Sequence, residues 1–108
     1  MVEQTINLDN IFQALADQTR RSILRQLTET SLSISELARS YQMSFAAVAK
    51  HVVKLEQAGL VSKKRAGKRQ VISITPKTIE AAITHLELYE KMWENRLDTL
   101  ESLIHESK

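Results

Sequence analysis

Residues 44–74 read SFAAVAKHVVKLEQAGLVSKKRAGKRQVISI, and the spacing of the apolar side chains changes within this stretch. Val48, Val52 and Leu55 recur at intervals of three or four residues, which places them on one face of a helix. After Gly59 the apolar residues alternate with polar ones, as they do in a half-buried strand. The change in period predicts a helix that is followed directly by extended chain.

The ends of these elements are marked by residues with specific backbone roles. Ser44 offers a side-chain oxygen to the first free N–H groups of the helix, and Gly59 suits the left-handed residue that follows its last turn. Residues 60–65 and 70–74 are the two candidate strands, and the short loop between them contains Gly67. Two β-rich runs around a short glycine-containing loop predict a β-hairpin.

Shorter helices are predicted before this stretch. The first covers about residues 8–16, and Asp17 can cap a second helix over residues 18–27. Ser33 and Glu36 form a capping box, in which each side chain satisfies a backbone N–H at the start of a third helix. The third and fourth helices, separated by a tight turn, form a helix-turn-helix.

A final helix is predicted from Pro76, which suits a first helical turn, to about Glu106. A hairpin directly after a helix-turn-helix makes a winged helix-turn-helix. We therefore predict a mainly α-helical chain with one small β-hairpin, in the order of four helices, two strands and one helix. We expect residues 1–108 to form a single domain, with a winged-helix core at 8–75 and a C-terminal dimerisation helix at 76–106.

The composition excludes several classes of protein. The chain contains no Cys, which excludes a disulfide framework, a thiolate metal site and a Cys nucleophile. No apolar run approaches the roughly 18–20 residues that cross a bilayer. Met1 to Asn10 lack the pattern of a signal peptide. We expect a soluble, cytoplasmic protein with no membrane partner.

The formal net charge of +2 hides a split along the chain. Residues 1–77 carry 12 basic and 6 acidic side chains, a net +6, whereas residues 78–108 carry 3 basic and 7 acidic side chains, a net −4. There is no acidic residue from Gln57 to Ile79. This asymmetry predicts a basic binding face and a separate acidic segment.

Basic side chains gather around the predicted hairpin tip. They are Lys63, Lys64, Arg65, Lys68 and Arg69. Alone, a basic loop is equally consistent with a solvated surface. After a helix-turn-helix it favours double-stranded DNA as the partner, because a helix fits the major groove and a two-stranded ribbon reaches the adjacent backbone or minor groove.

The fourth helix has an outward face with small and basic side chains. The residues opposite its apolar stripe are Ala46, Lys50, Val53 and Gln57. The flanking and boundary positions are Phe45, Ala47, Ala49, His51 and Lys54. Small side chains permit close approach to base edges, and Lys50 is the best candidate for a base or phosphate contact. Lys54 is also a candidate DNA-binding residue. For Phe45 and His51, a role inside the fold is at least as consistent as contact with DNA.

Several stretches together resemble the ArsR-type winged-helix transcriptional repressors. They are ALADQTRR at residues 14–21, ISELA at residues 34–38, VAKHVVKLEQAGLV at residues 48–61 and KKRAGKRQVISI at residues 63–74. They stand in the family's order and span about residues 8–76. The resemblance implies a homodimeric repressor that binds a palindromic operator, often in its own promoter.

By position, the resemblance assigns DNA contacts to the recognition helix, the wing and one arginine of the second helix. The matching residues are Arg20, Ser44, Phe45, Ala46, Ala49, Lys50, His51 and residues 63–69. The arginine that Arg20 matches either pairs with acidic groups or touches phosphate. Ala49 stands where the family usually has Ser, and Val53 and Lys54 reverse a common basic-then-apolar order.

The metal-sensing motifs of the family do not match this chain. The third-helix motif ELCVC corresponds to ELARS at residues 36–40, and the final-helix pattern D-x-H-x10-H-x2-E meets Ile83 and Arg96 where it requires Asp and His. Glu101 and His105 are one turn apart, but a solvated helix end explains them better than a shared site. We predict no metal and no cofactor, and the sequence is compatible with a small-molecule effector of unknown chemistry.

The final helix is expected to be roughly 45 Å long, which exceeds what the core of one small domain requires. Its apolar side chains recur at heptad spacing, with Glu90 interrupting one seam position. We expect a second copy, packed antiparallel about a two-fold axis, to cover this face. The predicted dimer interface comprises Ile11, Phe12, Ile83, Leu86, Tyr89, Trp93, Leu97, Leu100 and Ile104.

The sequence therefore predicts a sequence-specific DNA-binding transcriptional regulator, in the form of a dimeric repressor. The alternative is a winged-helix protein–protein interaction module without DNA binding, and the basic wing argues against it. An enzyme is disfavoured, because three scattered His and no Cys offer no catalytic site.

Overall fold

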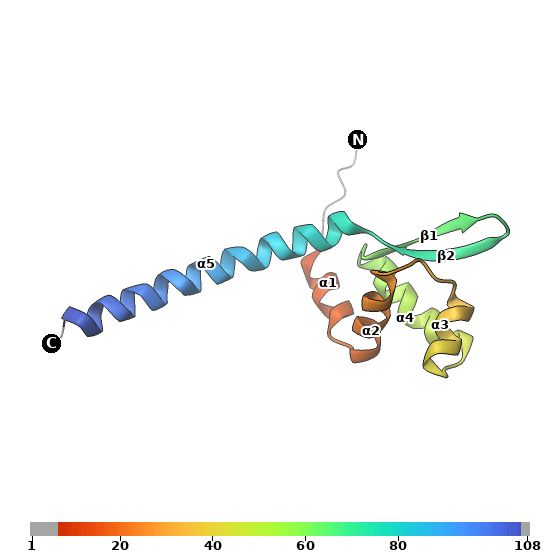
Figure 1. Ribbon diagram of the computed structural model, residues 1–108, viewed down its shortest axis with the longest axis horizontal. Helices are drawn as coiled ribbons and strands as arrows, with labels where there is room; N and C mark the ends of the chain where they lie inside the picture. Colours follow the sequence, from red (N-terminus) through yellow and green to blue (C-terminus); the bar gives the residue numbers. More distant parts are fainter. Residues whose placement is uncertain (1–6, 107–108) are drawn as a thin grey trace.

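The computed structural model describes residues 7–106, which form helices and one β-hairpin (Figure 1). The elements are α1 (Leu8–Leu15), α2 (Gln18–Leu27), α3 (Ile34–Tyr41), α4 (Phe45–Gln57), β1 (Val61–Ala66), β2 (Arg69–Ile74) and α5 (Pro76–Glu106). This order confirms the predicted fold class. Residues 1–6 and 107–108 of the predicted domain lie outside the described residues.

The predicted N-terminal caps are present on the short helices. Asp17 Oδ2 accepts the backbone N–H of Arg20 at 3.0 Å, which starts α2. Ser33 and Glu36 form the predicted capping box at the start of α3. Ser44 Oγ accepts the backbone N–H of Ala47 at 3.1 Å at the start of α4. Each cap satisfies a backbone donor that the helix itself leaves free.

The hydrophobic core joins all the helices to the base of the hairpin. Its buried residues are Ile11, Ala14, Ile23, Leu27, Leu37, Val48, Val52, Leu55, Ala58, Leu60, Val61, Ile72 and Ala82. The apolar stripe predicted for α4 is confirmed, because Val48, Val52 and Leu55 are all fully buried.

One residue of the predicted dimer interface belongs to this core instead. Ile11 is 0% exposed in the single chain, so its side chain has no surface to offer a second copy. We therefore correct its assignment from interface to core. Its neighbour Phe12 is 38% exposed and keeps a free surface.

The hairpin is tighter than the sequence indicated. Ala66 pairs with Arg69, so only Gly67 and Lys68 form the turn, and Gly67 has a φ of +67° that favours glycine. A bridge that the sequence pattern does not predict extends this sheet. Leu32, just before α3, exchanges backbone hydrogen bonds of 3.2 and 2.7 Å with Ile72 of β2.

The last helix leaves the rest of the molecule after its first turns. Figure 1 shows α5 extending away from the other elements. Ala82 is buried against the core, whereas Ile83 is half-exposed and the helix beyond residue 85 is exposed as far as His105. The radius of gyration is 19.1 Å, against about 13 Å for a compact chain of this length. Among the helices of residues 7–106, none is long and apolar enough to cross a membrane.

Candidate nucleic-acid interface

The outward face of α4 is the predicted one. Ala46, Lys50, Val53 and Gln57 are all exposed, on the side of α4 opposite the buried stripe. Lys54 is also exposed, and Ala49 is half-buried. The helix therefore presents small side chains near its start and lysines farther along. The small side chains allow the helix to approach the edges of base pairs closely.

The start of α4 carries an exposed aromatic side chain. Phe45 is 57% exposed, so it does not pack into the core. It lines a hollow of about 390 Å³ together with Ser35 of α3 and with Arg69 and Gln70 of β2. The first residues of α3 and α4 and the wing therefore border one surface depression.

Two of the five basic residues of the wing are engaged in ion pairs with helices. Lys63 Nζ lies 3.7 Å from Glu56 Oε1 of α4, and Arg69 donates to Glu36 Oε1 of α3. These pairs tie both strands of the hairpin to the helix-turn-helix. The remaining wing cations, Lys64, Arg65 and Lys68, are exposed and make no ion pair with any other residue of the described range.

The capping carboxylates carry lowered pKa values. The hydrogen bond from the backbone N–H of Arg20 lowers the pKa of Asp17. Hydrogen bonds from the backbone and side chain of Ser33 lower the pKa of Glu36, and Arg69 adds to the effect. Each donor favours the charged form of the carboxylate, so both groups stay ionised at neutral pH.

Arg20 of α2 is half-buried, and its guanidinium is held by contacts within the protein. Its Nε donates to the backbone oxygen of Ala14 at 2.7 Å, and a terminal nitrogen donates to the backbone oxygen of Gln13 at 3.1 Å. Its other terminal nitrogen lies 3.4 Å from Nδ1 of His51, whose side chain is 21% exposed. Of the alternatives for these two residues, the geometry favours contacts within the protein.

Comparison with known proteins identifies the family of this chain. Residues 17–63 match the sequence profile of the bacterial regulatory protein, arsR family. The chain is 38% identical over 96 residues to the HTH-type transcriptional regulator Rv2034 of Mycobacterium tuberculosis, with 89% of this chain and 87% of that protein covered. The chain belongs to the arsR family.

Two further proteins that this arsR-family chain resembles are also named as transcriptional regulators. It is 28% identical over 76 residues to the transcriptional repressor SdpR of Bacillus subtilis, with 70% of this chain and 84% of that protein covered. An ArsR-like transcriptional regulator from Rhodococcus superposes with a TM-score of 0.79 at 30% identity, over 89% of this chain and 91% of that one. This arsR-family protein is a transcriptional regulator and not an enzyme.

The second surface of this arsR-family regulator is the apolar side of α5. Its half-exposed large side chains include Ile83, Leu86, Tyr89, Trp93, Leu97, Leu100 and Ile104, between 45% and 63% exposed. All of them belong to the predicted interface.

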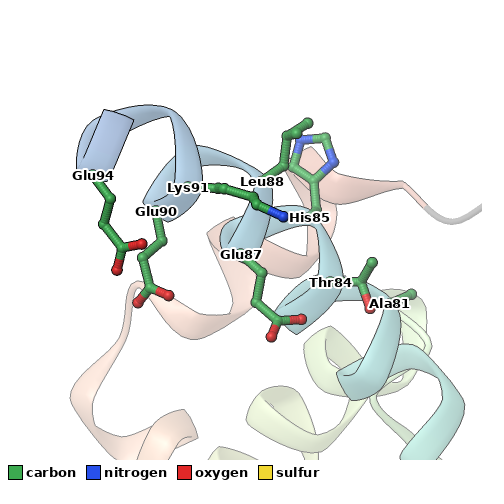
Figure 2. Close-up of a pocket in the computed structure, with 8 residues that line it drawn as sticks. All are labelled: Ala81, Thr84, His85, Glu87, Leu88, Glu90, Lys91 and Glu94. Atoms are coloured by element: carbon green, nitrogen blue, oxygen red, sulfur yellow. The ribbon is translucent and has the colours of Figure 1, made fainter. Parts of the chain in front are cut away.

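The surface of α5 next to the apolar stripe borders an open hollow whose lining residues, with Glu90 of the seam among them, all lie on this one helix. Figure 2 shows Glu87, Glu90 and Glu94 projecting from α5 in the same direction. Across the described part of the chain, no group of three or more His, Asp and Glu side chains is placed to hold a metal ion.

The sequence pattern does not predict three contacts near the candidate interface. The pairs Glu36–Arg69 and Glu56–Lys63, like the Leu32–Ile72 bridge, join residues that are far apart or belong to different elements. The sequence shows that the two members of each ion pair have opposite charges, but it does not indicate which helix residues lie close to the wing. Only the folded register of the hairpin brings these partners together.

Proposed function

We propose that this regulator is a sequence-specific repressor that binds a palindromic operator in double-stranded DNA as a homodimer. The exposed small and basic face of α4 carries the proposal, because it stands beside a hairpin whose free cations face solvent. The α4 face enters the major groove, and the wing contacts the neighbouring phosphates. Figure 1 shows the hairpin, α3 and α4 at the opposite end of the molecule from the C-terminus of α5, which leaves that helix free for pairing.

The proposed dimer uses the apolar side of α5. Exposed apolar side chains over so many turns are costly in water, since burying a Leu, Ile or Phe side chain stabilises by about 1.5–3 kcal/mol. When a second α5 packs antiparallel to the first, the apolar side of each helix contacts the apolar side of the other. A two-fold axis brings the same surface of both chains together in this way. Phe12 of α1 extends the same interface.

Repression and a cytoplasmic location belong to the same proposal. The relative SdpR is named a transcriptional repressor, which supports the repressing role. A dimer that covers an operator blocks other proteins from the same DNA. A small-molecule effector stays a prediction of the sequence, and it would act by changing the angle between the two recognition helices.

Mobility shift on the DNA upstream of the protein's own gene tests this function. The wild-type chain is expected to bind that DNA, and a chain with Lys50, Lys63, Lys64, Lys68 and Arg69 all changed to Ala is expected not to. Binding that survives all these changes contradicts the proposed DNA interface. Retention on heparin checks the basic surface independently of any sequence.

Single changes separate the two parts of the interface. Lys50→Ala is expected to cost about 1–3 kcal/mol on the operator and to reduce discrimination between operator and random DNA. Lys64→Ala and Lys68→Ala are expected to weaken binding to both DNAs and to reduce the salt slope by about 0.9 for each phosphate that the protein no longer neutralises. If Lys50→Ala weakens binding to operator and to random DNA equally, Lys50 does not contribute to base recognition.

A further inference from the structure

The side chain of Arg20 joins several helices at one point. Arg20 belongs to α2, and it donates hydrogen bonds to backbone oxygens of Gln13 and Ala14 in the last turn of α1. Its remaining terminal nitrogen contacts His51 in the middle of α4. The guanidinium therefore binds two carbonyl groups at the end of α1, of which that of Gln13 also accepts the backbone N–H of Ala16 at 3.2 Å. The same side chain reaches the recognition helix.

The chemistry of this contact assigns different roles to the two ring nitrogens of His51. A guanidinium has only donors, so Nδ1 of His51 accepts in this contact, which leaves Nε2 as the ring nitrogen that carries the proton. Asp17 Oδ2 lies 3.8 Å from the same Nδ1, which is too long for a hydrogen bond. That carboxylate instead accepts the backbone N–H of Arg20 and places a negative charge near the guanidinium.

The contact bears on the orientation of α4. His51 and Lys50 are consecutive, so their side chains point about 100° apart around the helix axis. His51 is directed towards the start of α2, whereas Lys50 is exposed on the outward face. A rotation of α4 that moved Lys50 along a DNA groove would break the bond between His51 and Arg20.

We propose that Arg20 and His51 are positioning residues, which hold the rotation of α4 about its own axis and contact no DNA themselves. This inference rests on the proposed function, because it concerns how the same interface is aligned. Three of the five N–H groups of Arg20 are already committed to protein acceptors. The residue that the family resemblance offered as a phosphate contact is thus an internal clamp on the recognition helix.

Salt dependence distinguishes a clamp from a phosphate contact. Arg20→Gln is expected to weaken operator binding at least about tenfold, as loss of hydrogen bonds from a charged group implies. Its affinity for random DNA and its salt slope are expected to stay at the wild-type values. Lys68→Gln is the matched control, because it removes one charge from the wing. It is expected to lower both the affinity for random DNA and the salt slope. A reduced salt slope for Arg20→Gln overturns the proposal.

Two substitutions of His51 test which ring nitrogen matters. The amide oxygen of Asn takes the place of Nδ1, whereas the amide of Gln takes the place of Nε2. His51→Asn is therefore expected to keep operator affinity within about threefold of wild type, and His51→Gln is expected to lose about tenfold or more. The opposite ranking means that Nε2 contacts DNA and overturns the proposal. Thermal melts of both variants confirm that each is folded.

A measurement on the protein alone keeps this inference separate from the proposed function. Long-range nitrogen–proton NMR spectra of the wild-type chain at neutral pH report which ring nitrogen of His51 carries the proton. A proton on Nε2 is expected, and a proton on Nδ1 overturns the inference whether or not the chain binds DNA. Absence of operator binding together with the expected tautomer refutes the proposed function and leaves the clamp intact.

Discussion

Ile11 and Phe12 are neighbours in α1 with opposite surroundings. Ile11 is fully buried, whereas Phe12 is 38% exposed. Helical spacing placed both on the apolar side of α1, because neighbouring positions on a helix differ by only about 100°. The sequence pattern therefore identified an apolar face without resolving which part of it α2 and α4 cover.

The two residues are expected to respond differently to truncation. Ile11→Ala should lower the free energy of unfolding by about 2–5 kcal/mol, because it leaves a cavity in the core. Phe12→Ala should have a smaller effect on unfolding and a larger effect on dimerisation. Thermal denaturation at fixed protein concentration and light scattering measure the two effects. Equal losses of stability would contradict the separation between core and interface.

At the scale of elements, the helices and the hairpin were predictable because their signals are local. Ser33 and Glu36 are near neighbours in sequence, and Gly59 ends α4 with a φ of +77°. The links between elements were not predictable. Glu36 serves the cap of α3 and also pairs with Arg69 of β2, and nothing near Glu36 in the sequence indicates the second role.

The capping carboxylates of α2 and α3 predict a loss of stability in acid. The folded-state pKa of Asp17 and of Glu36 is lowered, so each carboxylate contributes its full stabilisation above the unfolded-state pKa of about 4. That contribution disappears as the pH falls through the lowered folded-state value. The melting temperature of wild type is therefore expected to fall between about pH 5 and pH 2.

The matched control is the double variant Asp17→Asn and Glu36→Gln. Both replacements can still cap a helix, but neither titrates. The variant should melt lower than wild type near neutral pH and should lose less stability on acidification. The same acid slope for both proteins would assign the loss to other carboxylates.

The apolar side of α5 predicts dimerisation through its middle turns. Leu97→Glu should weaken the dimer roughly a thousandfold, because each of two copies loses about 2 kcal/mol of apolar burial. Asn95→Glu adds the same charge on the opposite side of α5 and should leave the dimer intact. Sedimentation over a range of concentrations measures both. A monomeric wild-type chain, or equal effects of the two changes, would exclude this face.

The whole molecule separates its charges in space. Residues 1–77, with a net +6, contain the winged helix, and most of residues 78–108, with a net −4, lie in α5. The longest extent of the molecule is 69 Å, so α5 carries most of its acidic charge far beyond a Debye length of about 8 Å from the wing. A near-neutral chain can therefore present a strongly basic surface to DNA.

Selection of binding sites from a pool of random duplex DNA tests the central claim most directly. Two recognition helices related by a two-fold axis should enrich an inverted repeat whose half-sites lie about one helical turn, or about 10 base pairs, apart. The Leu97→Glu variant should no longer enrich the inverted repeat, whereas the Asn95→Glu variant should still enrich it. An enriched single half-site from wild type, or no enrichment at all, would contradict a dimeric operator-binding regulator.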